Sequence, residues 1–111
     1  MKILVLPKPR EGVAREAMEQ HAAAEIQAVL DLYAQDVVRE LYVRGDQPGR
    51  VALVLEAPSV EDARSALTRL PFVRFELIGV DLIPLAPFTG LVRLAQAAQA
   101  AQAAQAAQRA S

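Results

Sequence analysis

The chain contains no cysteine and no tryptophan, and His21 is its single histidine. Without cysteine it can form no disulfide framework, no thiolate metal site, no iron–sulfur cluster and no cysteine nucleophile. One histidine does not supply the ligands of a structural zinc site or of a redox metal site built from several histidines. We therefore expect neither a metal nor a cofactor.

Excess charge of either sign is also lacking, because 12 basic residues face 13 acidic ones. This balance argues against nucleic acid as a partner and against an acidic disordered tail. No apolar run approaches the roughly 20 residues of a membrane span. The opening residues, 1–7, are too short for a signal peptide and lack its cleavage pattern. The sequence predicts a cytoplasmic protein without a membrane or nucleic-acid partner.

The 111 residues, 53% of them hydrophobic, are enough for one domain with its own core. The composition changes near Leu94, after which glutamine recurs at every third position among alanines. We predict a domain over residues 1–94 and an Ala/Gln-rich helical tail over residues 95–111. On a helix the glutamines step by about −60° each, so the tail has no single apolar face. It is either a repeat or engineered extension, or an arm that docks on another subunit.

Six segments alternate in character along residues 1–94. Apolar, β-branched and aromatic runs predict strands, apolar residues at helical spacing predict helices, and Ser59 with Asp62 resembles a capping box. The predicted elements are a strand at 2–6, a helix at 11–34, strands at 37–44 and 51–56, a helix at 59–70 that Pro71 ends, and an extended segment at 72–85. A further helix is predicted from about Thr89.

This β-α-β-β-α-β order predicts an α+β, ferredoxin-like sandwich with both helices on one face of a four-stranded antiparallel sheet. Residues 3–6 and 51–55 are apolar at consecutive positions, whereas a sheet with one face in water alternates apolar and polar residues. The second face is therefore expected to pack against a second copy. The prediction is a homodimer, or a larger oligomer built from it, in the form of a dimeric α+β barrel with a cavity for a small molecule between or beside the two sheets.

The first helix carries two residues that suggest catalysis. With about 100° per residue, Glu25 falls between Met18 and Val29, and His21 falls at the edge of the same stripe. A carboxylate on a packing face needs a partner, and positions i and i+4 can touch. His21 and Glu25 are the predicted catalytic pair, acting as a proton shuttle. The alternative is a structural ion pair at the edge of the helix. The stripe itself is the predicted core face and contains Met18, Ala22, Ile26, Val29, Leu30 and Tyr33.

The second strand suggests a binding surface. By the period of two, Val38, Glu40, Tyr42 and Arg44 share one face. Glu40, Tyr42 and Arg44 are the predicted substrate-binding residues, because an arginine beside a tyrosine can hold a carboxylate or carbonyl. The alternative is a solvated edge strand. Arg74 and Glu76 repeat this pattern on the last extended segment.

Nucleophilic hydrolysis has no support. There is no Gly-rich phosphate loop and no GxSxG motif, and Ser59, Ser65 and Ser111 form no plausible Ser-His-Asp set. Acid–base chemistry on a bound small molecule needs only one or two groups and stays open.

The segment from Glu56 to Glu61 reads Glu-Ala-Pro-Ser-Val-Glu and is followed by Leu67, Leu70-Pro71-Phe72, Glu76 and Val80. This pattern resembles muconolactone isomerase and its relatives. Residues 83–88, Ile-Pro-Leu-Ala-Pro-Phe, resemble a related branch of uncharacterised small proteins. The resemblance covers residues 1–94. It implies a dimeric α+β barrel and cofactor-free handling of a small organic acid or lactone, in which a proton moves and a double bond shifts.

The chain departs from that family in two places. The family has tryptophans on the second strand, where this chain has valines such as Val37 and Val43, and more lysines in the first helix, where this chain has Ala22–Ala24. Arg44 aligns with a family arginine. The leading hypothesis is an isomerase-like or cyclase-like protein. The alternatives are a non-catalytic binding or assembly module with a helical extension, and a haem-handling barrel with His21 as ligand.

Overall fold

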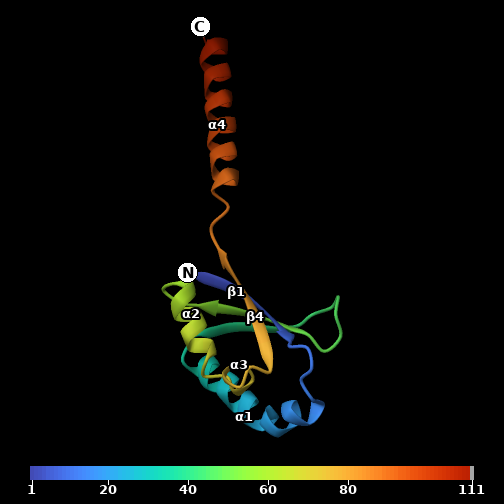
Figure 1. Cartoon of the computed structure of the whole chain (residues 1–111). Helices are drawn as coiled ribbons and strands as arrows, with labels where there is room; N and C mark the ends of the chain where they lie inside the picture. The colour runs from blue at the N-terminus through green and yellow to red at the C-terminus, as the bar shows by residue number, and fades with distance from the viewer. Residues whose placement is uncertain (111) are drawn as a thin grey trace.

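The computed structural model describes residues 1–110 as a body with a long helix projecting from it (Figure 1). The body contains the strands and the shorter helices in the predicted order, with one short helix added. The elements are β1 (Lys2–Pro9), α1 (Arg15–Ala34), β2 (Val38–Val43), β3 (Val51–Glu56), α2 (Val60–Leu67), α3 (Pro71–Arg74), β4 (Ile78–Leu85) and α4 (Thr89–Ala110).

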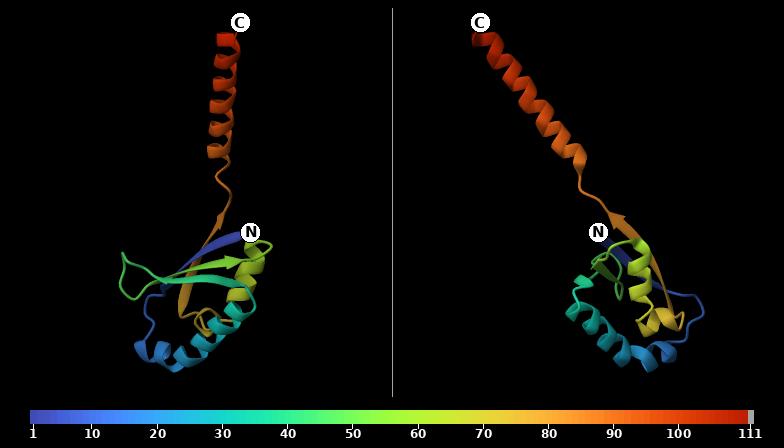
Figure 2. Two further views of the ribbon diagram at one scale, coloured as in Figure 1. Left: turned by 180° about the vertical axis from the view of Figure 1, so that it is seen from behind. Right: turned by 90° about the vertical axis from the view of Figure 1, so that its left-hand side faces the viewer.

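The strands form one antiparallel sheet in the order β2-β3-β1-β4, which is the ferredoxin-like arrangement. The helices α1, α2 and α3 lie on one face of this sheet, and the other face is uncovered (Figure 2). The predicted α+β ferredoxin-like fold is therefore confirmed. The C-terminal helix is also confirmed, and it begins at Thr89 as expected.

The core lies between the central strands and α2. Ile3 and Val5 of β1 pair in register with Leu55 and Leu53 of β3, and all four are buried. Leu67 of α2 is fully buried against the same cluster. Alternation along the strands places these side chains on the helix-covered face.

Two prolines lie inside β1, which runs to Pro9 rather than ending near Leu6. Pairing with β3 stops at Val5, whereas pairing with β4 continues through Pro9. The Arg10 N–H donates to Leu77 O at 3.1 Å, so by alternation the nitrogens of Pro7 and Pro9 point to the other side, beyond the end of β3. Their missing N–H groups therefore break no ladder hydrogen bond.

The start of α2 is capped as the sequence predicts. Ser59 has an extended backbone, and its Oγ accepts a hydrogen bond from the Asp62 N–H at 3.1 Å. We expect Ser59→Ala to lower the free energy of unfolding by about 1 kcal/mol, because an orphan N–H loses its acceptor. Ser65→Ala, an exposed position within the same helix, is the matched control and should change it little. Equal losses in urea unfolding for the two variants would contradict the capping role.

The segment after α2 is not one extended strand. Pro71–Arg74 forms the short helix α3, Glu76 takes a left-handed conformation with φ 57°, and β4 begins only at Ile78. Proline suits the first helical position, so Pro71 starts α3 instead of only ending α2. The prediction that Arg74 and Glu76 lie on a strand is therefore wrong.

The predicted shared face of β2 is also wrong. Val38 pairs with Leu55, but Glu40 pairs with Val54, so the register shifts between Val38 and Glu40. One extra residue at such a bulge exchanges the two faces of the strand beyond it. Val38 is consequently buried in the core, whereas Glu40 and Tyr42 lie opposite residues of the uncovered face.

Helix α1 begins at Arg15, not near Glu11, and does not pack closely on the sheet. It contacts α3 and β2, and Leu32 is its only buried residue. The predicted core stripe is therefore not buried as a whole, since Ile26 is 63% and Leu30 54% exposed. These side chains face the sheet across open space, which forms the cavity described below.

Helix α4 projects away from the body as a continuation of β4 (Figures 1 and 2). None of its described residues is buried. Phe88, Leu91 and Leu94, around its start, are between 61% and 74% exposed. Within residues 1–110, no helix is both long and apolar enough to cross a membrane.

The uncovered face of the sheet has an apolar centre and a charged rim. Its centre is formed by Leu4 with Val54 on one side and Ile83 on the other, in register. Lys2 lies opposite Glu56 at one end, and Lys8 pairs with Asp81 at 3.8 Å at the other. We refer to this surface as the open face.

Candidate functional site

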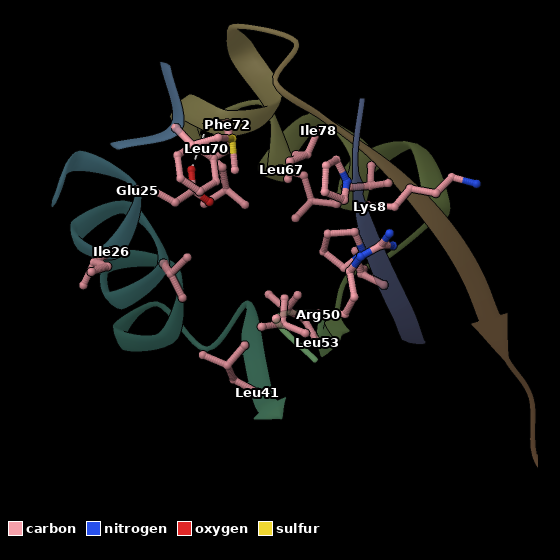
Figure 3. A pocket seen from close by; sticks show the side chains of 18 of the residues that line it. Lys8, Glu25, Ile26, Leu41, Arg50, Leu53, Leu67, Leu70, Phe72 and Ile78 are labelled. Atoms are coloured by element: carbon pink, nitrogen blue, oxygen red, sulfur yellow. Dashed lines mark hydrogen bonds between the residues drawn. The ribbon is translucent and has the colours of Figure 1, made fainter. Parts of the chain in front are cut away.

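A cavity of about 370 Å³ lies between α1 and the helix-covered face of the sheet (Figure 3). Its wall is almost entirely apolar, and most of its residues come from α1, β1, β3 and the segment around α3. The side chains that dominate the wall are Met18, Ile26, Val29, Leu41, Leu53, Leu67, Phe72 and Ile78. A cavity of this size and polarity suits a small organic molecule with few polar groups.

Glu25 is the one acidic residue in this wall. Its Oε1 accepts a hydrogen bond from the Phe72 N–H at 2.9 Å. That amide belongs to the first turn of α3 and therefore has no partner within its own helix. Burial raises the pKa of the Glu25 carboxyl above its ordinary 4.5, and the Phe72 hydrogen bond opposes this only in part. A fixed, partly desolvated carboxyl of this kind is suited to general acid–base work.

His21 lies one helical turn from Glu25, but it is outside the cavity wall. Its ring stacks on Phe75, with centroids 4.5 Å apart and an interplanar angle of 24°. The Arg74 guanidinium lies 4.9 Å from the centroid of the same Phe75 ring. Within residues 1–110, His21 makes no hydrogen bond or ion pair with Glu25. Its ring therefore contacts the end of α3, and its catalytic role stays a prediction.

Glu40 and Tyr42 lie together, at another place. The Tyr42 hydroxyl donates to Glu40 Oε1 at 2.7 Å, and this hydrogen bond is the main cause of a raised Tyr42 pKa. Both residues border a second hollow of about 420 Å³ between α1 and the edge strand β2. Neither belongs to the wall of the apolar cavity. The bulge near Arg39 accounts for this placement, because it turns both side chains away from the helix-covered face.

Arg44 is held in the hairpin turn after β2. Its Nε and Nη2 donate to the two carboxylate oxygens of Asp46 at 2.9 and 2.6 Å. The hydrogen bond from Arg44 is the main reason why the pKa of Asp46 is lowered. A bidentate pair of this kind occupies the guanidinium. The structure therefore does not bring the five predicted site residues into one cavity: only Glu25 lines the apolar one.

Two features of this cavity were not predicted from the sequence. Arg50, directly before β3, lies on the side of the cavity opposite Glu25 (Figure 3). The Phe72 N–H positions the Glu25 carboxyl. A backbone donor leaves no mark in the sequence, and Arg50 looks like any other residue of a polar turn. The one available signal was Gly49 before it, which indicates a tight turn that brings the chain back along the sheet.

No group of three or more His, Cys, Asp or Glu side chains that could hold a metal ion occurs in the part of the chain that the structure describes. The charged residues that line the apolar cavity are Lys8, Glu25 and Arg50.

The fold is similar to that of two solved enzymes. The 5-chloro-2-hydroxyhydroquinone dehydrochlorinase from Burkholderia phenoliruptrix AC1100, solved with 2,5-dihydroxybenzoquinone, is 20% identical with a TM-score of 0.60, over 78% of this chain and 94% of that one. Muconolactone isomerase is 22% identical with a TM-score of 0.61, over 79% of this chain and 93% of that one. The sequence matches no protein-family model, and no curated protein is significantly similar to it. The resemblance to muconolactone isomerase is thus confirmed as a likeness of fold.

Proposed function

We propose that this protein moves a proton within a small organic acid or lactone bound in the apolar cavity, without a cofactor. The reaction is of the isomerase or cyclase type. The observation that carries the proposal is Glu25, a carboxyl with a raised pKa, fixed by the Phe72 N–H in an otherwise apolar wall. When ionised, such a group can accept a proton from carbon, and its raised pKa makes the ionised form a stronger base than an ordinary carboxylate.

The proposed step conserves every atom. The Glu25 carboxylate removes a proton from a carbon next to the substrate carbonyl, and the electron pair of the broken C–H bond moves into a dienolate. The Glu25 carboxyl, whose proton can exchange with solvent, then gives a proton to another carbon of the dienolate, and the double bond shifts. The apolar wall strengthens electrostatic interactions with the developing charge by excluding water. No oxidant, reductant or second substrate is consumed.

The names of the two structural neighbours are compatible with this chemistry. One is an isomerase of a lactone, and the other removes hydrogen chloride from a chlorinated hydroquinone. Both reactions need a group that takes a proton from a small oxygenated molecule. Because the likeness in sequence is low, it supports a class of substrate for this chain and does not identify one.

The test is proton exchange in D₂O, followed by ¹H NMR, with muconolactone and simpler unsaturated lactones as substrates. The protein should either shift a double bond or incorporate deuterium beside the carbonyl, faster than buffer does. Exchange without net isomerisation would still show that Glu25 or another base acts on the ring. If none of these lactones exchanges faster than in buffer, the proposed function is wrong for this substrate class.

We also propose that the working form is a homodimer joined through the open face. The apolar centre around Leu4, Val54 and Ile83 supports this, because a contiguous apolar surface with a charged rim is typical of an interface. A two-fold axis would bring the same surface of both copies together. The cytoplasmic location stays a prediction.

The alternative, a non-catalytic module with an assembly arm, is favoured by one observation: α4 leaves the body and has no buried residue. Under this alternative, ending the chain after Leu94 should reduce the oligomer size measured by light scattering. If α4 is only an extension, the shortened chain should keep both its oligomeric state and its exchange activity.

A further inference from the structure

Arg50 is a cation without a partner at the wall of an apolar cavity. It is partly buried, and it lies across the cavity from Glu25 (Figure 3). Among residues 1–110, no carboxylate and no carbonyl oxygen accepts a hydrogen bond from its side chain, and it forms no ion pair. A guanidinium has five donors in a fixed fork. Those of Arg50 are not buried, so they are open to water or to a ligand. An anion bound in the cavity would satisfy them.

The hairpin turn explains why Arg50 has no partner within the chain. The Arg50 N–H donates to Gln47 O at 3.2 Å, and its carbonyl accepts from the Arg44 N–H at 2.9 Å, so the backbone is fixed at the start of β3. Gly49 has φ 76°, which L side chains rarely adopt, and lets the turn close. Asp46 is the one acidic residue of the turn, and both its oxygens are taken by Arg44. The Arg44–Asp46 pair thereby keeps Asp46 away from Arg50.

Lys8, the other cation near the cavity, does not point its charge into it. Alternation places the Lys8 side chain on the open face, where it pairs with Asp81 at 3.8 Å, and Figure 3 shows its ammonium group pointing away from the cavity. The cavity therefore has two charged groups of opposite sign on opposite sides, Glu25 and Arg50, with apolar wall between them.

We propose that Arg50 binds the carboxylate of the substrate, so that the substrate is a largely apolar monocarboxylate with its reactive C–H at the end away from the carboxylate. This rests on the proposed function, since it adds the substrate class to the site of Glu25. A guanidinium and a carboxylate form a bidentate pair, which fixes the position and the plane of the bound carboxylate group. Repulsion by Glu25 disfavours the reversed orientation, in which two carboxylates would meet.

The experiment compares 2-naphthoate with its neutral isostere, 2-naphthamide, by NMR titration of the ¹⁵N-labelled full chain. In the wild type, 2-naphthoate should shift the amides of Gly49, Arg50 and Phe72 and should bind on the order of tenfold more tightly than the amide. Arg50→Gln should weaken the binding of 2-naphthoate by about that factor and leave the binding of 2-naphthamide unchanged. Arg50→Lys should recover part of the loss. Arg64→Gln, an exposed charge change on α2, is the matched control and should have no effect.

Two results would overturn the inference: equal binding of the two probes in the wild type, or unchanged 2-naphthoate binding in a folded Arg50→Gln protein. Binding does not depend on turnover, so the two proposals fail separately. If Arg50 favours 2-naphthoate over 2-naphthamide but no lactone exchanges protons, the inference about Arg50 is supported and the proposed function is contradicted. If Glu25→Gln removes exchange while Arg50→Gln binds 2-naphthoate normally, the proposed function is supported and the role of Arg50 in carboxylate binding is contradicted.

Discussion

Replacing Glu25 with glutamine is expected to lower kcat for proton exchange by about 10²- to 10⁴-fold, the usual contribution of a positioned general base. Glutamine retains an oxygen that can accept the Phe72 N–H, so the local structure around α3 should persist. It cannot take up a proton from carbon. The measurement is the initial rate of deuterium incorporation, and a variant that keeps the wild-type rate would remove Glu25 from the mechanism.

The matched control is Glu19→Gln on the same helix. Glu19 is exposed and pairs with Arg15, at 3.2 Å across one helical turn. The same charge change away from the cavity should leave the rate unaltered. His21→Phe tests the other predicted catalytic residue by itself. Phenylalanine can keep the ring stack on Phe75, but it lacks both ring nitrogens. A wild-type rate in His21→Phe would show that Glu25 works without His21. Loss of rate would support the predicted pair.

The raised pKa of Glu25 makes a second, independent prediction for the same variant. Because burial raises the pKa above 4.5, the folded protein binds this proton at a pH where the unfolded chain has lost it. The free energy of unfolding therefore falls as pH rises from 4.5 through the raised pKa. Glu25→Gln lacks this loss, so it should become more stable relative to wild type as pH rises through that window. Urea unfolding between pH 4 and 8 tests this, and a constant difference would contradict it.

The catalytic rate should depend on ionisation of the same carboxyl, but it should rise with pH where the free energy of unfolding falls. A base must be ionised, so the rate of proton removal should rise with pH, with a midpoint above 4.5. Higher activity and lower stability over one pH window would then have a single cause. A carboxyl held at a functional site against the preference of the fold commonly behaves in this way.

Much of this fold could be predicted from local pattern. Turn residues, apolar runs and the Ser59 cap mark the order of elements, and two-faced apolar strands indicate a surface that needs a partner. The errors occur where one backbone residue changes the geometry. The extra residue near Arg39 exchanges the faces of β2, and the left-handed Glu76 breaks what reads as a continuous strand. Neither has a clear sequence signal, since both positions hold ordinary charged residues.

The candidate site was predictable only as far as it depends on helical periodicity. Glu25 conflicts with its apolar neighbours on α1, and that conflict is visible in the sequence. The cavity is not, because it exists only where α1 lies away from the sheet, and this depends on how α3 and β2 hold the helix. Arg44 was the natural choice among the arginines of the turn. The structure pairs it with Asp46 and leaves Arg50 at the cavity.

Placing a lysine at the centre of the open face, with Val54→Lys, is expected to separate the proposed homodimer into folded monomers. Two-fold symmetry would bring two copies of the charge into one apolar contact, at a cost of several kcal/mol, or about 10²-fold or more in the dissociation constant.

The monomer should tolerate the change, because Val54 lies in register opposite Glu40, and opposite charges across neighbouring strands are favourable. Ala24→Lys, which adds the same charge at an exposed position of α1, is the matched control and should leave the dimer intact. Sedimentation velocity over a range of concentrations measures the outcome, and circular dichroism confirms folding. A folded Val54→Lys protein that still dimerises would show that the copies meet elsewhere. A wild type that is monomeric at every concentration would contradict the proposed homodimer.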